Sequence, residues 1–181
     1  MIKNLKNKKV WFITGSQHLY GDKILAKVAE HSRKITEGLN NSSFVSVSLE
    51  YKDPVTSPED IFSIIQEANN APECIGIITW MHTFSPAKMW INGLKILQKP
   101  LLHLHTQYNR DIPWDSIDMD FMNLNQSAHG DREFGFMVSR MRINRKIIVG
   151  HLQDKDVIQQ LANWTRVVAA WHSMQGAKIV R

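Results

Sequence analysis

The sequence predicts an α/β fold that is doubly wound, with a mostly parallel sheet and helices on both of its faces. Short and nearly continuous apolar runs recur along the chain, as is typical of strands buried on both faces of a parallel sheet. Between them lie segments with apolar residues at helical spacing, so strand and helix alternate throughout. The architecture is therefore of the flavodoxin or Rossmann type. The length of 181 residues fits a single domain, 1–181.

The apolar runs place six strands along the chain. The second strand alternates apolar and polar residues, and the third is the most continuously apolar of the set. The sixth strand is incomplete, because the chain stops inside it. The predicted strands are 10–14, 44–51, 74–80, 100–105, 146–150 and 177–181.

Helix starts are marked by capping residues. Ser57 and Ser85 are each followed by proline, which suits an N-cap followed by the first helical position. Ser127 and Asp154 are also N-cap types. The predicted helices cover about 24–39, 58–68, 86–97, 127–141 and 155–171.

Residues 123–135 concentrate hydrogen-bonding side chains at the predicted start of a helix. Ser127 would cap it, and Asp131 and Glu133 would lie near the positive end of its dipole. Such a helix start suits a polyol or an anion, although a well-capped surface helix explains the pattern equally well. The polar loops that follow strands 10–14, 74–80 and 100–105 should share the carboxyl edge of the sheet, where ligands bind in such folds.

The connection 106–125 is long for a compact domain, and such connections usually serve function or contact a partner. It carries more apolar bulk than a solvated loop needs, which predicts that the chain self-associates. The alternative is that the loop packs back on its own domain. The apolar residues concerned are Tyr108, Trp114, Met119, Phe121 and Met122.

Composition excludes several classes of protein. The formal charge is +5, but the basic clusters at 3–9 and 140–146 lack the interleaved aromatics or motif of a nucleic-acid site. No apolar run is long enough to span a bilayer, and the amino terminus lacks the pattern of a signal peptide. Cys74 is the only cysteine, so we expect no intrachain disulfide and a reducing, cytoplasmic setting.

The loop GSQHLYG at 15–21 is neither a dinucleotide fingerprint nor a P-loop, so a nucleotide cofactor is disfavoured. Gln17, His18 and Tyr20 are types that contact sugars, although a plain strand–helix turn also explains the glycines of the loop. His103 and His105 face the same side of a strand and could bind a metal, but no third ligand follows by spacing. Hydrogen-bonded core histidines are the alternative. No nucleophile elbow is present.

Five segments closely resemble bacterial L-arabinose isomerases. They are GSQHLYG at 15–21, TWMHTFSPAKMW at 79–90, KPLLHLHTQ at 99–107, IDMDFMNLNQ at 117–126 and AHGDREFGF at 128–136. The resemblance covers essentially the whole chain. Members of this family are more than twice as long, so the chain resembles their N-terminal domain, with the central and C-terminal domains absent.

The resemblance implies an aldose–ketose isomerase of arabinose catabolism that interconverts L-arabinose and L-ribulose. It implies Mn²⁺ held by two Glu and two His in the later domains, so we expect no metal ligand in this chain and no activity from the chain alone. It also implies a homohexamer with active sites between subunits. Gln17, Leu19, Tyr20 and Phe84 would line the pocket, while Gln126 and His129 would reach the site of a neighbouring subunit.

Under the resemblance, His129 would assist ring opening or orient a sugar hydroxyl, and we favour orientation. Two alternatives stay open: a free-standing sugar-binding module without catalysis, and a purely structural oligomerisation module.

Overall fold

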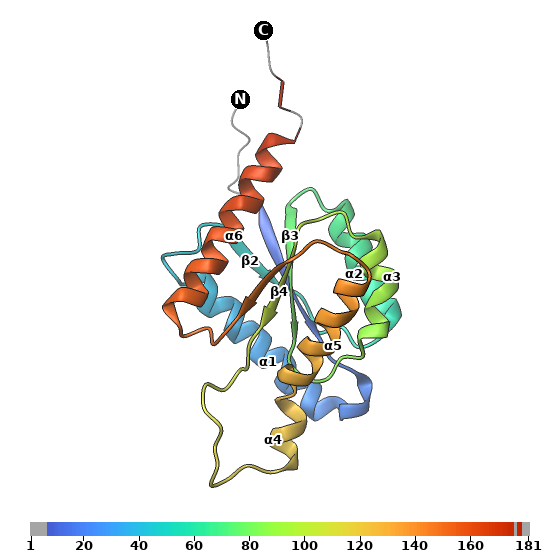
Figure 1. Cartoon of the computed structure of the whole chain (residues 1–181), viewed down its shortest axis with the longest axis vertical. Helices are drawn as coiled ribbons and strands as arrows, with labels where there is room; N and C mark the ends of the chain where they lie inside the picture. Colours follow the sequence, from blue (N-terminus) through green and yellow to red (C-terminus); the bar gives the residue numbers. More distant parts are fainter. Residues whose placement is uncertain (1–6, 176, 179–181) are drawn as a thin grey trace.

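The computed structural model describes residues 7–175, 177 and 178. The sheet has five strands, and every neighbouring pair is parallel, in the order β2-β1-β3-β4-β5. This is the strand order of flavodoxin-like folds, so the predicted fold class is confirmed. The strands are β1 Lys9–Gly15, β2 Ser48–Tyr51, β3 Cys74–Met81, β4 Leu101–His105 and β5 Lys146–Val149 (Figure 1). The strand predicted at 177–181 falls mostly outside the described residues.

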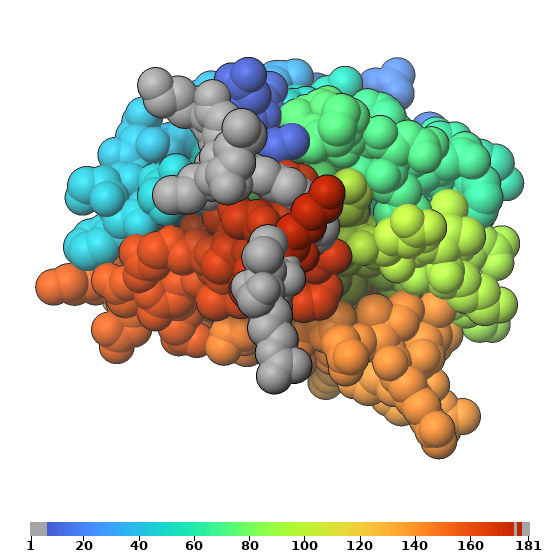
Figure 2. Space-filling view, turned by 90° about the horizontal axis from the view of Figure 1, so that it is seen from above, coloured from blue at the N-terminus to red at the C-terminus, as the bar shows by residue number. Residues whose placement is uncertain are grey.

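Helices cover both faces of the sheet. α1 Gly21–Asn40 and α6 Lys155–Met174 pack on one face, where they share a buried cluster with Phe12, Ile78 and Leu102. α2 Pro58–Asn70, α3 Ile91–Ile96 and α5 Ser127–Arg140 pack on the other, around Trp11 and Ile77. Seen from above, the red α6 and the green α2 and α3 lie on different sides of the molecule (Figure 2). No helix of the described residues is long and apolar enough to cross a membrane.

Of the two serines predicted to cap a helix before a proline, one does so and the other does not. Ser57 caps α2, since its Oγ accepts the N–H of Asp60 at 3.1 Å. Ser85 is not a cap: its Oγ accepts the indole N–H of the buried Trp90 at 3.0 Å. The segment after it is a 3₁₀ turn, η2 Ala87–Trp90, which leads into the short α3.

The other two predicted caps also differ from expectation. Ser127 is the first residue of α5 rather than its N-cap, and its hydroxyl donates to the carbonyl of His82. Asp154 does occupy the N-cap position of α6, but its side chain does not cap the helix. Its carboxylate pairs instead with Arg110 at 2.6 Å.

Two further segments are more structured or shorter than predicted. The second strand is confined to Ser48–Tyr51, because 44–47 lie outside the ladder with β1. The connection 106–125 is not wholly irregular, since it contains α4 Met119–Leu124, capped by Asp118 through the N–H of Phe121. α4 lies at the lower end of the molecule, directly before α5 (Figure 1).

The strand order reverses between β1 and β3. The chain leaves β1 towards α1 on one face and leaves β3 towards η2 and α3 on the other. In folds of this type the crevice at such a reversal is the usual ligand position. Gly15 closes the edge tightly here, since a Cβ on it would lie 2.6 Å from Met81 Sδ and 2.8 Å from Ser85 Cβ.

Candidate functional site

The candidate site lies at the carboxyl ends of β1 and β3. The loop after β1 contains the turn η1 His18–Tyr20, and the loop after β3 runs from His82 to Pro86. The hydroxyls of Ser16 and Thr83 hydrogen-bond across the two loops at 2.6 Å, and both residues are fully buried. The two loops are therefore held together at their roots.

The start of α5 is fixed to the loop after β3. The backbone N–H of Gln126 donates to the carbonyl of His82 at 3.0 Å, and the Ser127 hydroxyl reaches the same carbonyl. A Cβ at Gly130 would lie 3.0 Å from both Met81 Cβ and the Thr83 carbonyl oxygen. Only glycine allows this close approach of the helix to the loop.

Asp131 adds a buried polar anchor in the next turn of α5. The residue is 1% exposed, and its Oδ1 accepts the N–H of Met81 at 3.2 Å and lies 2.8 Å from Nε2 of His103. Burial raises the pKa of Asp131 well above its usual value. Burial, and then repulsion by His105 and Arg145, lowers the pKa of His103 to about 3. The pair therefore joins α5, β3 and β4 and is protected from solvent.

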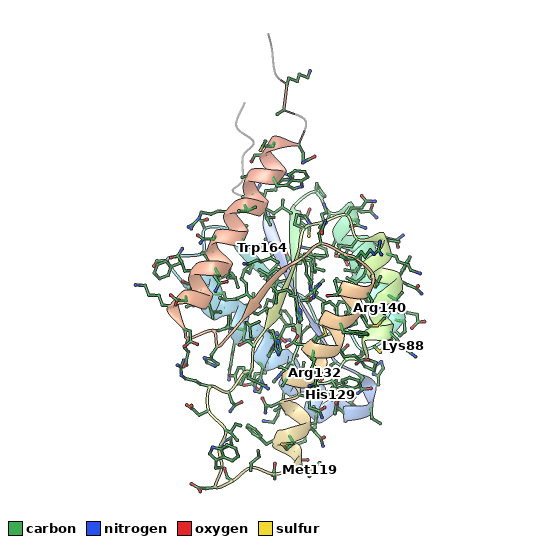
Figure 3. The ribbon with its side chains drawn as sticks, viewed as in Figure 1. Lys88, Met119, His129, Arg132, Arg140 and Trp164 are labelled. Carbon is green, nitrogen blue, oxygen red and sulfur yellow. The ribbon has the colours of Figure 1, made fainter. Side chains whose placement is uncertain are left out.

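Three of the predicted site residues meet at this helix start. The rings of Phe84 and His129 stack with centroids 4.5 Å apart and an interplanar angle of 24°, and the backbone N–H of His129 donates to the carbonyl of Gln126. His129 is exposed at the lower end of α5, where Figure 3 labels it. Phe84 and His129 thus form one surface, although they come from different elements.

The other three predicted residues, Gln17, Leu19 and Tyr20, lie together in and beside η1. Leu19 is 84% exposed, which is unusual for a large aliphatic side chain. Within the described residues, no hydrogen bond or ring contact joins these three side chains to Phe84 or His129. The Ser16–Thr83 hydrogen bond and the close packing of Gly15 on Met81 and Ser85 hold together the two loops that carry them.

A histidine pair at the same edge was not found from the sequence. Nδ1 of His31 and Nε2 of His82 are 2.7 Å apart, so one ring donates to the other. The Tyr108 ring stacks on His31 at 3.5 Å and the Trp80 ring stacks on His82 at 4.3 Å. Burial lowers the pKa of His82 to about 3 and that of His31 to about 4, so both rings are neutral at neutral pH. The partners lie 51 positions apart, so no local spacing indicated them.

Three hollows lie beside the carboxyl ends of the strands. One has a volume of about 450 Å³ and is bounded by α1, the loop after β4 and the β5–α6 turn, with Lys34, Gln107, Tyr108 and His151 among its lining residues. A second, of about 550 Å³, lies at the end of β5 and the start of α6, and a third, of about 300 Å³, is lined by residues of the 107–125 segment. None of the three is lined by a predicted site residue.

Among the described residues, the two strand histidines belong to no group of three candidate metal ligands. The His103 and His105 rings are parallel with centroids 6.0 Å apart, and His103 Nε2 is already engaged by Asp131. Among the described residues, no group of three or more His, Cys, Asp or Glu could hold a metal ion. The alternative of hydrogen-bonded core histidines therefore accounts for His103.

The chain is similar in sequence to proteins of known family. Residues 4–176 match the family model described as the L-arabinose isomerase N-terminal domain. A relative named L-arabinose isomerase from Herpetosiphon aurantiacus is 61% identical over 98% of this chain, one from Koribacter versatilis is 60% identical, and one from Geobacillus thermodenitrificans is 57% identical. The chain spans 36% of the length of each. Among solved structures, an azoreductase from Bacillus anthracis aligns with 93% of this chain and 96% of its own, at 9% identity and a TM-score of 0.34. This chain belongs to the family of L-arabinose isomerase N-terminal domains.

Proposed function

We propose that this chain works as the N-terminal domain of an L-arabinose isomerase, which interconverts L-arabinose and L-ribulose in the cytoplasm. The observation that carries the proposal is the 57–61% identity, over 98% of the chain, to relatives named L-arabinose isomerase. Since the chain spans only 36% of their length, it would supply part of the enzyme. The alternative of a free-standing module predicts sugar binding or assembly without catalysis.

Within that enzyme the chain would form a rim for the sugar. The half-buried Phe84 and the exposed His129 stacked on it offer an aromatic surface to the C–H face of a sugar, next to the backbone of Gln126. The amides of Gln17 and Gln126 can donate to and accept from hydroxyls, and Tyr20 adds a phenol. Leu19 would lose its unfavourable exposure once the substrate or a neighbouring subunit covers it.

His129 would orient the sugar rather than transfer a proton. No carboxylate among the described residues hydrogen-bonds its ring, whereas a general acid or base is normally held by such a partner. The ring is instead held by its stack on Phe84, which fixes its plane and leaves its nitrogens available to a hydroxyl.

The described residues do not fit a divalent metal, as His103 and His105 illustrate, so the Mn²⁺ implied by the resemblance would be held by other parts of the enzyme. When bound, such an ion supplies polarisation of the sugar oxygens. The residues of this chain would bind, orient and shield the substrate, and they would contribute a surface for the assembly of several copies.

A domain exchange tests the proposal. This chain replaces the matching 178 residues of the Herpetosiphon aurantiacus relative, and the homologous segment of the Geobacillus thermodenitrificans relative serves as the positive control. We expect the first exchange to convert L-arabinose to L-ribulose with Mn²⁺, and the 181-residue chain alone to form none. The proposal would be overturned if the control exchange were active while the exchange protein that contains this chain assembled but formed no L-ribulose.

His129→Asn in the active exchange protein tests the role of the ring. A neutral hydrogen bond to a sugar hydroxyl contributes about 0.5–1.5 kcal/mol, so kcat/KM should fall about tenfold or less, with the pH profile retained. A loss above about a hundredfold, with one limb of the pH profile removed, would assign proton transfer to His129.

A further inference from the structure

The base of the loop after β1 is held by the segments on both sides of it. On one side the Ser16 hydroxyl bonds to that of Thr83. On the other side Val55 forms a parallel bridge with Gly15, and its carbonyl accepts the N–H of Ser16 at 2.9 Å. Thr56 follows directly, so the connection from β2 to α2 is fixed beside the loop that contains η1.

The tip of this loop, residues 17–20, has much less support than its base. Leu19 is 84% exposed there. The ring of His18, however, has its Nε2 atom 2.9 Å from the hydroxyl oxygen of Thr56. Within the described part of the chain, this is the one side-chain hydrogen bond between the loop tip and another segment. The position of the loop tip therefore depends on the contact between these two side chains.

The direction of this hydrogen bond follows from Asp60. The hydroxyl of Thr56 donates to Asp60 Oδ2 at 3.1 Å, and the backbone N–H of Thr56 donates to the same oxygen at 3.3 Å. Partial burial raises the pKa of Asp60, but hydrogen bonds from Ser57 and Thr56 outweigh it and lower the pKa, so the carboxylate is ionised at neutral pH. Because the single hydroxyl hydrogen of Thr56 goes to Asp60, the Thr56 oxygen accepts the Nε2–H of His18.

We infer that Thr56 and Asp60 are positioning residues for the candidate site, and that they act through the ring of His18. Asp60 orients the Thr56 hydroxyl, and this hydroxyl holds the ring and with it the loop tip. Because ordering a loop on binding costs free energy, a loop tip that is already held binds its ligand more tightly. The inference rests on the proposed function for the sugar that the tip binds, whereas the anchoring itself is measurable without substrate.

Backbone ¹⁵N relaxation of the 181-residue chain tests the anchoring directly. Thr56→Val keeps the shape of the side chain and removes the hydroxyl, so the order parameters of residues 18–20 should fall from about 0.85 to about 0.6. Thr56→Ser retains the hydroxyl and should restore the native values. Asp53→Asn, which removes a carboxylate from the same connection where it accepts the Tyr51 hydroxyl, is the charge control and should leave the loop tip rigid. A loop tip equally rigid in Thr56→Val and in the native chain would overturn the inference.

Kinetics in the active exchange protein test the consequence for the sugar. Thr56→Val should raise KM for L-arabinose about two- to tenfold, the range of one neutral hydrogen bond, and should leave kcat within about twofold. Asp60→Ala should raise KM by less, because the Thr56 hydroxyl remains but is no longer oriented. An unchanged KM, or a loss confined to kcat, would overturn the positioning role. An exchange protein inactive with every native residue would count against the proposed function instead, and the relaxation measurement would still decide the anchoring.

A double-mutant cycle separates anchoring through His18 from an independent effect of Thr56. His18→Asn has no nitrogen at the position of Nε2, so it breaks the same hydrogen bond from the other side. If Thr56 acts through the ring, Thr56→Val should change KM by less than about twofold once His18→Asn is present. Rises in KM that multiply in the double variant would show that Thr56 acts without the ring, and the inference would be wrong.

Discussion

The buried histidine pair should make the free energy of unfolding depend on pH. His82 is 0% exposed and stacked on Trp80, and its pKa is lowered to about 3 because the protonated ring would be buried. In the unfolded chain the pKa returns to about 6.5. As pH falls below 6.5, the unfolded state binds a proton that the folded state does not bind, so stability is lost continuously down to about pH 3.

The magnitude follows from the two pKa values. Each pH unit between them costs about 1.4 kcal/mol, so His82 alone should lower the free energy of unfolding by about 2 kcal/mol between pH 7 and pH 5. Asp131 has the opposite sign, because its raised pKa favours the folded state at low pH and this contribution is lost as pH rises. Asp131 is present in the native chain and in both variants, so its contribution cancels when their pH dependences are compared.

Urea unfolding at pH 7 and pH 5 measures the effect in the native chain and in His82→Asn. The native chain should lose about 2 kcal/mol more than the variant between the two values. Ile78→Val, a change in the buried cluster that contains Trp80, on which His82 stacks, is the control for a general loss of stability and should keep the native pH dependence. An equal loss in the native chain and His82→Asn would show that a protonated His82 is accommodated, and that the burial reasoning is wrong.

Three further substitutions test the packing of the same edge by urea unfolding. Gly15→Ala should cost about 1–3 kcal/mol because its Cβ meets a sulfur at 2.6 Å, whereas Gly38→Ala, with nothing within 4 Å, should be neutral or stabilising by up to about 1 kcal/mol. Ser57→Ala should cost about 1 kcal/mol through the lost cap, and the exposed Ser63→Ala on the same helix should cost nothing. Asp131→Ala should cost about 2–4 kcal/mol, because a buried N–H and a histidine nitrogen lose their partner, and Asp131→Asn should cost less. If a substitution and its paired control changed the free energy of unfolding equally, the contact assigned to that position would be wrong.

The three central strands, β1, β3 and β4, were predictable because burial on both faces favours a nearly continuous apolar run in each of them. All eight residues of β3 are buried, so its apolar run marks the strand without any knowledge of its neighbours. Chain order and the alternation of elements then restrict the topology to a few arrangements. The second strand was overextended because apolar alternation continues at Val45 and Val47, which pack on the core outside the ladder.

Helix caps were less predictable, because a serine hydroxyl accepts a hydrogen bond from whichever donor the fold brings near it. Ser57 is only partly buried and accepts the N–H of Asp60 three residues on, so its local geometry decides its role. Ser85 is buried against Trp90, whose indole N–H must be satisfied, so the tertiary bond replaces the cap. The sequence around Ser85 shows that it could cap a helix, but it does not show that a buried indole N–H will use the same hydroxyl.

The polar stretch at the start of α5 shows the same limit at the candidate site. Its composition predicted an exposed helix start, yet the residues divide by helical spacing into two faces. Ser127 and Asp131, four apart, are buried and hold the helix to β3 and β4, while His129 and Arg132, three apart, are exposed. Polar side chains are usually exposed, so the sequence alone could not assign the inner pair to anchoring. This anchoring sets the position of the helix start and therefore the position of the His129 ring against Phe84. Asp131 thus influences the geometry of the Phe84–His129 stack although it bonds to neither ring.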